Sequence, residues 1–191
     1  MQRLGLFGGS FNPVTWGHLL VARAALEELN LDRLFFIPAA QSPFKPGQQM
    51  ASGGTRLRLL RLALAGQTDF DVDDQELRRG GISYTIDTLR NYSERFPGAE
   101  LFYLVGGDHA ASLPLWHRAP ELARLAEFVI LLRPGSAPPQ IPPPFRGRIL
   151  HGIPFAVSAS MVRARLRAGL PVDGLVPDAV AEALGESRIY G

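Results

Sequence analysis

The chain has 191 residues, of which 46% are apolar, and this length suits a single globular domain over residues 1–191. It contains no cysteine, which excludes disulfides and thiolate metal sites. The formal net charge is only +2, and no stretch is long and apolar enough to span a bilayer. We therefore expect a cytoplasmic protein without nucleic-acid or membrane partners. The sequence leaves the oligomeric state open, a homo-oligomer included.

Apolar runs and helical periodicities alternate along the chain. Short apolar runs predict strands at 4–7, 34–37, 70–73, 101–105, 128–132 and 148–153. Helical spacing and helix caps predict helices at 17–29, from a cap at Thr55 to about 64, at 85–96, around 113–125, at 158–168 and at 177–184. Residues 39–54 read as a long loop of the kind that often binds ligands. This alternation predicts a Rossmann-like, three-layer α/β fold whose mostly parallel sheet is covered by helices on both faces.

Ligands of such sheets bind beyond the carboxyl ends of the strands. After the first strand come Gly8 and Gly9, and then Thr15-x-Gly17-His18 at the start of a helix. The glycines let the backbone approach a ligand, and a helix N-terminus attracts phosphate. His18 can donate an N–H to a phosphate oxygen, while Thr15 offers a hydroxyl. The pattern is neither a dinucleotide fingerprint nor a P-loop. Taken alone, the same residues are also typical of a turn with a polar helix end.

Three further features are candidates, each with an ordinary structural alternative. Ser158 or Ser160 can cap a helix from which Arg163 reaches phosphates, although a solvent-exposed arginine would look the same. Asp108 follows a buried strand and could accept ribose hydroxyls or cap a helix. Trp116 could stack on a base or lie in the core. Lys45 is the only lysine of the chain, by chance or because a compact ammonium is needed there.

Together these residues resemble the nucleotidyltransferase superfamily that carries a Thr/His-x-Gly-His signature and a C-terminal Ser-x-x-x-x-Arg. Within it, the chain is similar almost end to end to the bacterial nicotinate-mononucleotide adenylyltransferases. The more specific matches are Ser83-Tyr84-Thr85-x-Asp87-Thr88-Leu89 and Leu113-Pro114-x-Trp116.

The resemblance implies transfer of an adenylyl group from ATP to nicotinate mononucleotide, with release of pyrophosphate, in NAD biosynthesis. It implies an ATP site formed by Gly8, Gly9, Ser10, Phe11, His18, Gly106, Asp108, Arg133, Ser158 and Arg163. It implies a nicotinate-nucleotide site formed by Tyr84, Thr85, Trp116, His117 and Lys45, and a catalytic set of His18, Arg163, Lys45 and Thr15. Mg²⁺ would be held mainly by the ATP phosphates, since we see no cluster of carboxylates for a protein cage.

Some residues depart from the usual bacterial pattern. Thr15 stands where that pattern has histidine, and Ser10-Phe11-Asn12 stands where it has Thr-Phe-Asp, so these positions are similar to the eukaryotic nicotinamide-mononucleotide enzymes. His117 stands where an aromatic residue often follows the tryptophan. Nicotinamide mononucleotide is therefore an alternative acceptor, and phosphopantetheine is a more remote one. Rivals from other classes are a non-catalytic nucleotide sensor and an NAD(P)-dependent oxidoreductase, the latter disfavoured by the missing fingerprint.

Overall fold

The computed structural model describes residues 1–44, 49–132, 135–153, 155–186 and 189–190. Its strands are β1 Arg3–Gly9, β2 Arg33–Pro38, β3 Phe70–Val72, β4 Glu100–Gly106, β5 Glu127–Leu131 and β6 Gly147–Leu150. Its helices are α1 Trp16–Leu29, α2 Gly53–Ala63, α3 Gln75–Arg79, α4 Thr85–Arg95, the 3₁₀ helix η1 Gly107–Leu115, α5 Ala119–Leu125, α6 Ala159–Arg167 and α7 Asp178–Glu186.

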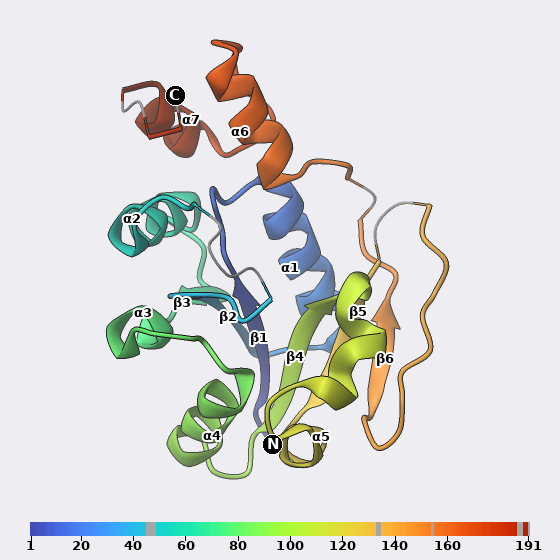
Figure 1. Cartoon of the computed structure of the whole chain (residues 1–191). Helices are drawn as coiled ribbons and strands as arrows, with labels where there is room; N and C mark the ends of the chain where they lie inside the picture. The colour runs from blue at the N-terminus through green and yellow to red at the C-terminus, as the bar shows by residue number, and fades with distance from the viewer. Residues whose placement is uncertain (45–48, 133–134, 154, 187–188, 191) are drawn as a thin grey trace.

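The six strands form one sheet in the order β3-β2-β1-β4-β5-β6, and every neighbouring pair is parallel. The predicted Rossmann-like α/β fold is therefore confirmed. From β1 the chain builds outward to β2 and β3, and it then returns to the other side of β1 as β4. The crevice at this reversal is where doubly wound sheets bind ligands. Figure 1 places α6 and α7 beyond the carboxyl ends of the strands.

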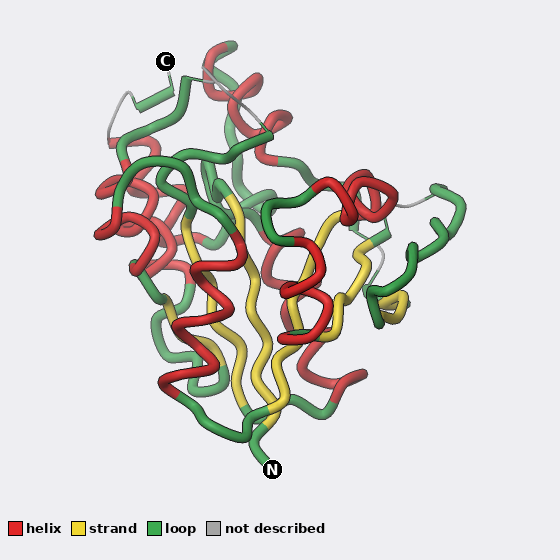
Figure 2. Tube along the Cα trace, turned by 60° about the horizontal axis from the view of Figure 1, so that its bottom comes forward, coloured by secondary structure: helices red, strands yellow, loops and turns green. Residues whose placement is uncertain are grey.

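Side chains alternate across the buried strands, so that each face of the sheet has its own apolar core. Phe7, Phe36 and Leu104 belong to the core that also contains residues of α1, α2, α6 and α7. Leu6 and Phe35 belong to the other core, which includes residues of α4, η1 and α5. Figure 2, which looks at the molecule from below, shows the strands lying between these helices.

The last strand, predicted at 148–153, ends at Leu150, and three larger differences separate the predicted elements from the structure. Helix α2 is capped by Ser52, whose Oγ accepts a hydrogen bond from the Thr55 backbone, so the prediction of Thr55 as the cap was wrong. The predicted helix around 113–125 is two helices, η1 and α5, separated where Arg118 has a φ of 56°. The five-residue helix α3 was not predicted, because it is too short for a periodic apolar pattern.

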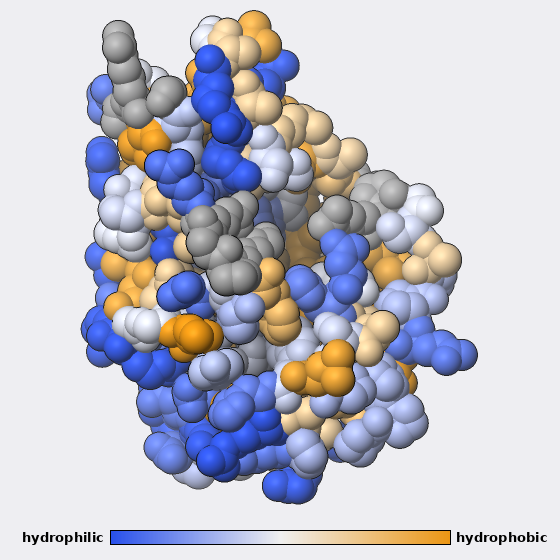
Figure 3. Space-filling view, viewed as in Figure 1, coloured by the Kyte–Doolittle hydropathy of each residue, from blue (hydrophilic) through white to orange (hydrophobic). Residues whose placement is uncertain are grey.

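Hydrophobic side chains lie in small separate groups among hydrophilic ones on the face drawn in Figure 3. Within the described ranges, none of the helices combines the length and the apolar character that crossing a bilayer would require.

Candidate active site

His18 lies at the start of α1, and its imidazole is held by Thr15. The backbone nitrogen of Thr15 lies 3.1 Å from Nδ1 of His18, and the Thr15 hydroxyl oxygen lies 2.8 Å from the same atom. A backbone N–H can only donate, so Nδ1 is an acceptor and the neutral ring carries its proton on Nε2. Burial lowers the pKa of His18 from 6.5 to about 4, which keeps the ring neutral near pH 7. The arrangement leaves Nε2–H as a donor for a phosphate oxygen.

The loop between β1 and α1 is shaped by strain and by aromatic packing. Phe11 has a φ of 44°, a left-handed conformation that is unusual outside glycine. Its ring is buried and meets the His18 ring edge-on, with 5.2 Å between centroids. The side chain of Phe11 thus packs against the imidazole, and its role at the ATP site stays a prediction.

Gly17 permits a close approach of the chain that follows β6. A Cβ placed on Gly17 would lie 2.7 Å from the carbonyl oxygen of Val157. Ser158 is one of the two predicted caps, and it does cap α6. Its hydroxyl oxygen accepts a hydrogen bond from the Met161 backbone N–H. One turn later, Arg163 donates through Nη1 to the Asn12 carbonyl oxygen at 2.7 Å. The glycine of the Thr-x-Gly-His signature therefore brings Arg163 to the loop that precedes His18.

The start of α1 is partly occupied by the protein itself. The Trp16 backbone N–H donates to the carbonyl oxygen of Leu175, which precedes α7. A phosphate at this end of the helix therefore has fewer free backbone donors than a bare helix N-terminus would offer.

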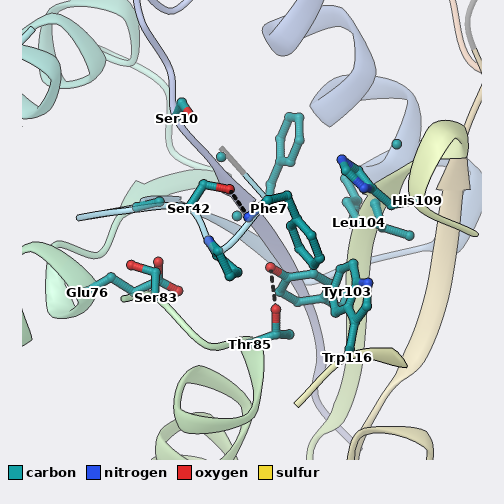
Figure 4. A pocket seen from close by; sticks show the side chains of 17 residues that line it. Phe7, Ser10, Ser42, Glu76, Ser83, Thr85, Tyr103, Leu104, His109 and Trp116 are labelled. Carbon is teal, nitrogen blue, oxygen red and sulfur yellow. Dashed lines mark hydrogen bonds between the residues drawn. The ribbon is translucent and has the colours of Figure 1, made fainter. Parts of the chain in front are cut away.

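A pocket of about 160 Å³ opens at the carboxyl ends of β1 and β4 (Figure 4). Six predicted site residues line it, namely Gly8, Gly9, Ser10, Thr85, Gly106 and Trp116. Thr85 is the first residue of the eleven-residue helix α4, and its hydroxyl donates to the Tyr103 hydroxyl at 3.3 Å. The pocket therefore combines a helix N-terminus, suited to an anion, with an indole.

Trp116 lies in the core and also lines the pocket, and its stacking on a base stays a prediction. It is 8% exposed and packs edge-on against Tyr103 and Phe128 in the core. It also lines the pocket, where the ring of Phe44 lies 5.1 Å from it between centroids. An aromatic side chain of the 39–54 loop thus occupies a face of the indole on which a planar ligand could stack.

Other predicted residues lie beside this pocket rather than in it. His117 packs against Tyr84 with 4.6 Å between ring centroids, and both line a smaller adjoining cavity. Asp108 lies exposed in the first turn of η1, directly beyond β4. Lys45 and Arg133 lie outside the described residues, so their roles stay predictions.

Sequence reasoning missed several residues that line the pocket. Phe44, Glu76, Ser83, Tyr103 and His109 were not chosen as site residues, yet all five face it. His109 could have been found, since it follows Gly106-Gly107-Asp108 directly after a buried strand. Glu76 carries no local signal, because it comes from the unpredicted helix α3. Burial raises the pKa of the Glu76 carboxyl, which accepts a hydrogen bond from the Thr88 hydroxyl at 2.6 Å.

The fold and this site define an α/β protein of the nucleotidyltransferase type. In the comparisons, the cytidylyltransferase-like family model matches residues 6–165. The chain is 40% identical, over 99% of its length and 98% of the relative's, to a probable nicotinate-nucleotide adenylyltransferase of Opitutus terrae. It is 39% identical, over 100% and 98%, to one of Shouchella clausii.

Solved structures show the same fold. The nicotinic acid mononucleotide adenylyltransferase of Plasmodium falciparum, complexed with NaAD, superposes with a TM-score of 0.79 at 15% identity, covering 100% of this chain and 98% of that one. A putative nicotinate-nucleotide adenylyltransferase of Vibrio parahaemolyticus gives a TM-score of 0.72 at 17% identity, covering 100% and 96%. The chain belongs to the cytidylyltransferase-like family and, within it, to the nicotinate-nucleotide adenylyltransferases.

Proposed function

We propose that this chain transfers the adenylyl group of ATP to nicotinate mononucleotide, giving nicotinate adenine dinucleotide and pyrophosphate in NAD biosynthesis. The observation that carries the proposal is the identity of about 40% along nearly the whole chain to relatives named for this activity. A cytoplasmic location stays a prediction.

The chemistry is an in-line displacement at the α-phosphorus of ATP. An oxygen of the mononucleotide phosphate forms the new P–O bond, and the bond to the β-phosphate oxygen breaks so that pyrophosphate leaves. The second pKa of a phosphate monoester is about 6, so the nucleophile is largely ionised at pH 7 without a general base. Catalysis then consists mainly of positioning two polyanions and neutralising their charge.

His18 and Arg163 are suited to this task. The Thr15 contacts fix the His18 ring in the tautomer that donates from Nε2, and a neutral donor needs no proton transfer. Arg163 comes from α6 to the same loop and carries the positive charge. Ser158 caps the helix that presents it. Loss of one such donor to a transition-state oxyanion costs about 10²–10³ in rate.

The acceptor side is proposed to lie in the pocket at Trp116 and Thr85. The indole offers a stacking surface for a pyridine ring, and the N-terminus of α4 offers backbone donors and a positive dipole end for a carboxylate. This arrangement favours the acid over the amide. Asp108, at the start of η1, is proposed to hold the adenosine ribose.

Mg²⁺ is proposed as a cofactor held mainly by the ATP phosphates. Among the described residues, no three histidine, aspartate, glutamate or cysteine side chains gather as a ready metal site. When bound, the ion would neutralise phosphate charge.

A pyrophosphate-release assay with ATP and each pyridine mononucleotide tests the proposal. We expect release that depends on both ATP and nicotinate mononucleotide, with a higher kcat/KM for the acid than for the amide. A preference for nicotinamide mononucleotide would replace the acceptor and leave the reaction class intact. ATP binding without any pyrophosphate release would instead support the nucleotide sensor, and reduction of a nicotinamide coenzyme would support the oxidoreductase.

A further inference from the structure

Asn12 is a buried polar residue that joins distant parts of the chain. It is 4% exposed, and its side-chain oxygen Oδ1 accepts two hydrogen bonds. One comes from the Ala51 backbone nitrogen at 3.1 Å, and the other comes from the Tyr190 hydroxyl at 2.6 Å. Tyr190 lies 178 residues further along the sequence, beyond α7. The loop that leads into α1 is thus fixed by a tyrosine near the other end of the chain.

The backbone of the same residue holds Arg163. Nη1 of Arg163 donates to the Asn12 carbonyl oxygen at 2.7 Å, and Nη2 donates to the Ser160 hydroxyl at 3.1 Å. Because a guanidinium is planar and rigid, these two contacts define where its remaining N–H donors point. The position of the Asn12 carbonyl therefore sets the position of the guanidinium.

Arg56 holds the loop from its buried side. Its side chain is 2% exposed, and it donates from Nη1 to the Ser10 carbonyl oxygen at 2.8 Å and from Nε to the Ala51 carbonyl oxygen at 3.0 Å. Ala51 thus binds Arg56 through its oxygen and Asn12 through its nitrogen. With Arg56 fixing Ser10, the hydrogen bonds from Tyr190 and Ala51 to Asn12 place the next part of the loop.

The Tyr190 hydroxyl is a stable donor. Burial raises the pKa of Tyr190 to about 12, while the positive charges of Arg163 and Arg56 oppose that rise. The phenol therefore keeps its proton throughout the physiological pH range. With Oδ1 of Asn12 accepting, the amide orientation is defined, because a flipped amide would point its N–H₂ group at the Ala51 backbone N–H.

We propose that Tyr190 is a positioning residue for adenylyl transfer, which acts through Asn12 to place the Arg163 guanidinium. The inference rests on the proposed function, in which Arg163 meets the phosphates. Tyr190 does not line the pocket between β1 and β4, and its hydroxyl donates to Asn12. Its contribution is to hold a catalytic group rather than to be one.

A double-mutant cycle between Tyr190→Phe and Arg163→Ala tests the inference. Tyr190→Phe removes only the hydroxyl, and we expect kcat/KM for ATP to fall about 2- to 10-fold, the size of one neutral hydrogen bond. Pyrophosphate release and the melting temperature Tm are measured for all four proteins. In the Arg163→Ala background, Tyr190→Phe should cause no further loss, because the group that it positions is gone.

Tyr92→Phe is the matched control. The Tyr92 hydroxyl donates to Asp73 at 2.9 Å in the other core of the molecule. Its removal should lower Tm and leave kcat/KM unchanged. The control would then show that a loss of stability alone does not lower kcat/KM.

The outcomes distinguish a failure of the positioning role from a failure of the proposed function. Equal losses from Tyr190→Phe with and without Arg163, or no loss while Arg163→Ala is impaired, would overturn the positioning role alone. Full activity of Arg163→Ala would overturn this role together with the assignment of Arg163. A wild-type enzyme without pyrophosphate release would instead refute the proposed function.

Discussion

Nδ1 of His18 lies 2.8 Å from the hydroxyl oxygen of Thr15 and 3.1 Å from its backbone nitrogen. Both contacts converge on one nitrogen, so the other nitrogen is left as the donor. We therefore propose that the threonine of the signature acts on the phosphates through the histidine. It selects the tautomer and fixes the plane of the ring.

Thr15→Val tests this relationship, because it keeps the shape and the backbone contact but removes the hydroxyl. We expect kcat to fall about 10-fold, because the His18 ring loses one hydrogen bond. Thr15→Ser restores the hydroxyl and should recover most of the rate. Equal rates in the valine and serine variants would mean that the backbone contact alone orients His18.

The stability of the protein should depend on pH through His18. The folded ring has a pKa of about 4 and the unfolded ring one of 6.5. Between these values the unfolded chain binds a proton that the folded chain does not, so this contribution is fully present above pH 6.5 and is lost as the pH falls toward 4. Urea unfolding at pH 7 and pH 4.5 should show a smaller acid loss in His18→Asn than in wild type, by about 2 kcal/mol. Identical losses would mean that the ring is not desolvated.

Gly17→Ala should impair activity through the position of α6. The added methyl group would meet the Val157 carbonyl oxygen at 2.7 Å, and displacement of that backbone would carry Ser158 and Arg163 with it. We expect kcat/KM for ATP to fall roughly 10- to 100-fold. Gly54→Ala is the control, since Gly54 is also the second residue of a helix and its nearest neighbour would be the Ser52 hydroxyl at 3.9 Å. If both variants keep wild-type kinetics, the close approach at Gly17 has no role in activity.

Phe44→Ala should strengthen binding of the pyridine nucleotide. The Phe44 ring lies against the indole of Trp116, so a pyridine ring must displace it in order to stack on that face. We expect KM for nicotinate mononucleotide to fall about 2- to 5-fold, as the displaced contact is worth about 0.5–1 kcal/mol. Phe155→Ala, an exposed phenylalanine that does not line this pocket, should leave KM unchanged. A higher KM in Phe44→Ala would show that Phe44 contributes to the acceptor site.

The strands and the first helix were predictable because their signals are local. A short apolar run such as Leu34 to Ile37, stopped by a proline, favours a strand of a covered sheet, and the glycines at the end of β1 mark where that strand ends. The positions of Gly8, Thr85 and Trp116 at one pocket then follow from topology, since parallel strands end at a common edge.

What could not be predicted depends on contacts between distant residues. The bond from Tyr190 to Asn12 and the burial of Arg56 below Ser10 have no periodic signature, because each is made only after the sheet has formed. The same holds for Phe44, whose place against Trp116 is set by the path of a loop. Propensity and spacing report on neighbours along the chain and not on these pairs.

We propose that a neutral, oriented His18 stabilises the charge that develops on the phosphates. The most direct test is single-turnover adenylyl transfer by His18→Ala at saturating ATP and nicotinate mononucleotide, with Tm measured alongside. We expect the rate to fall about 10²- to 10³-fold at an unchanged or slightly lower Tm, because the contacts of Thr15 with the ring are lost as well. Transfer at the wild-type rate by a folded His18→Ala enzyme would contradict the account.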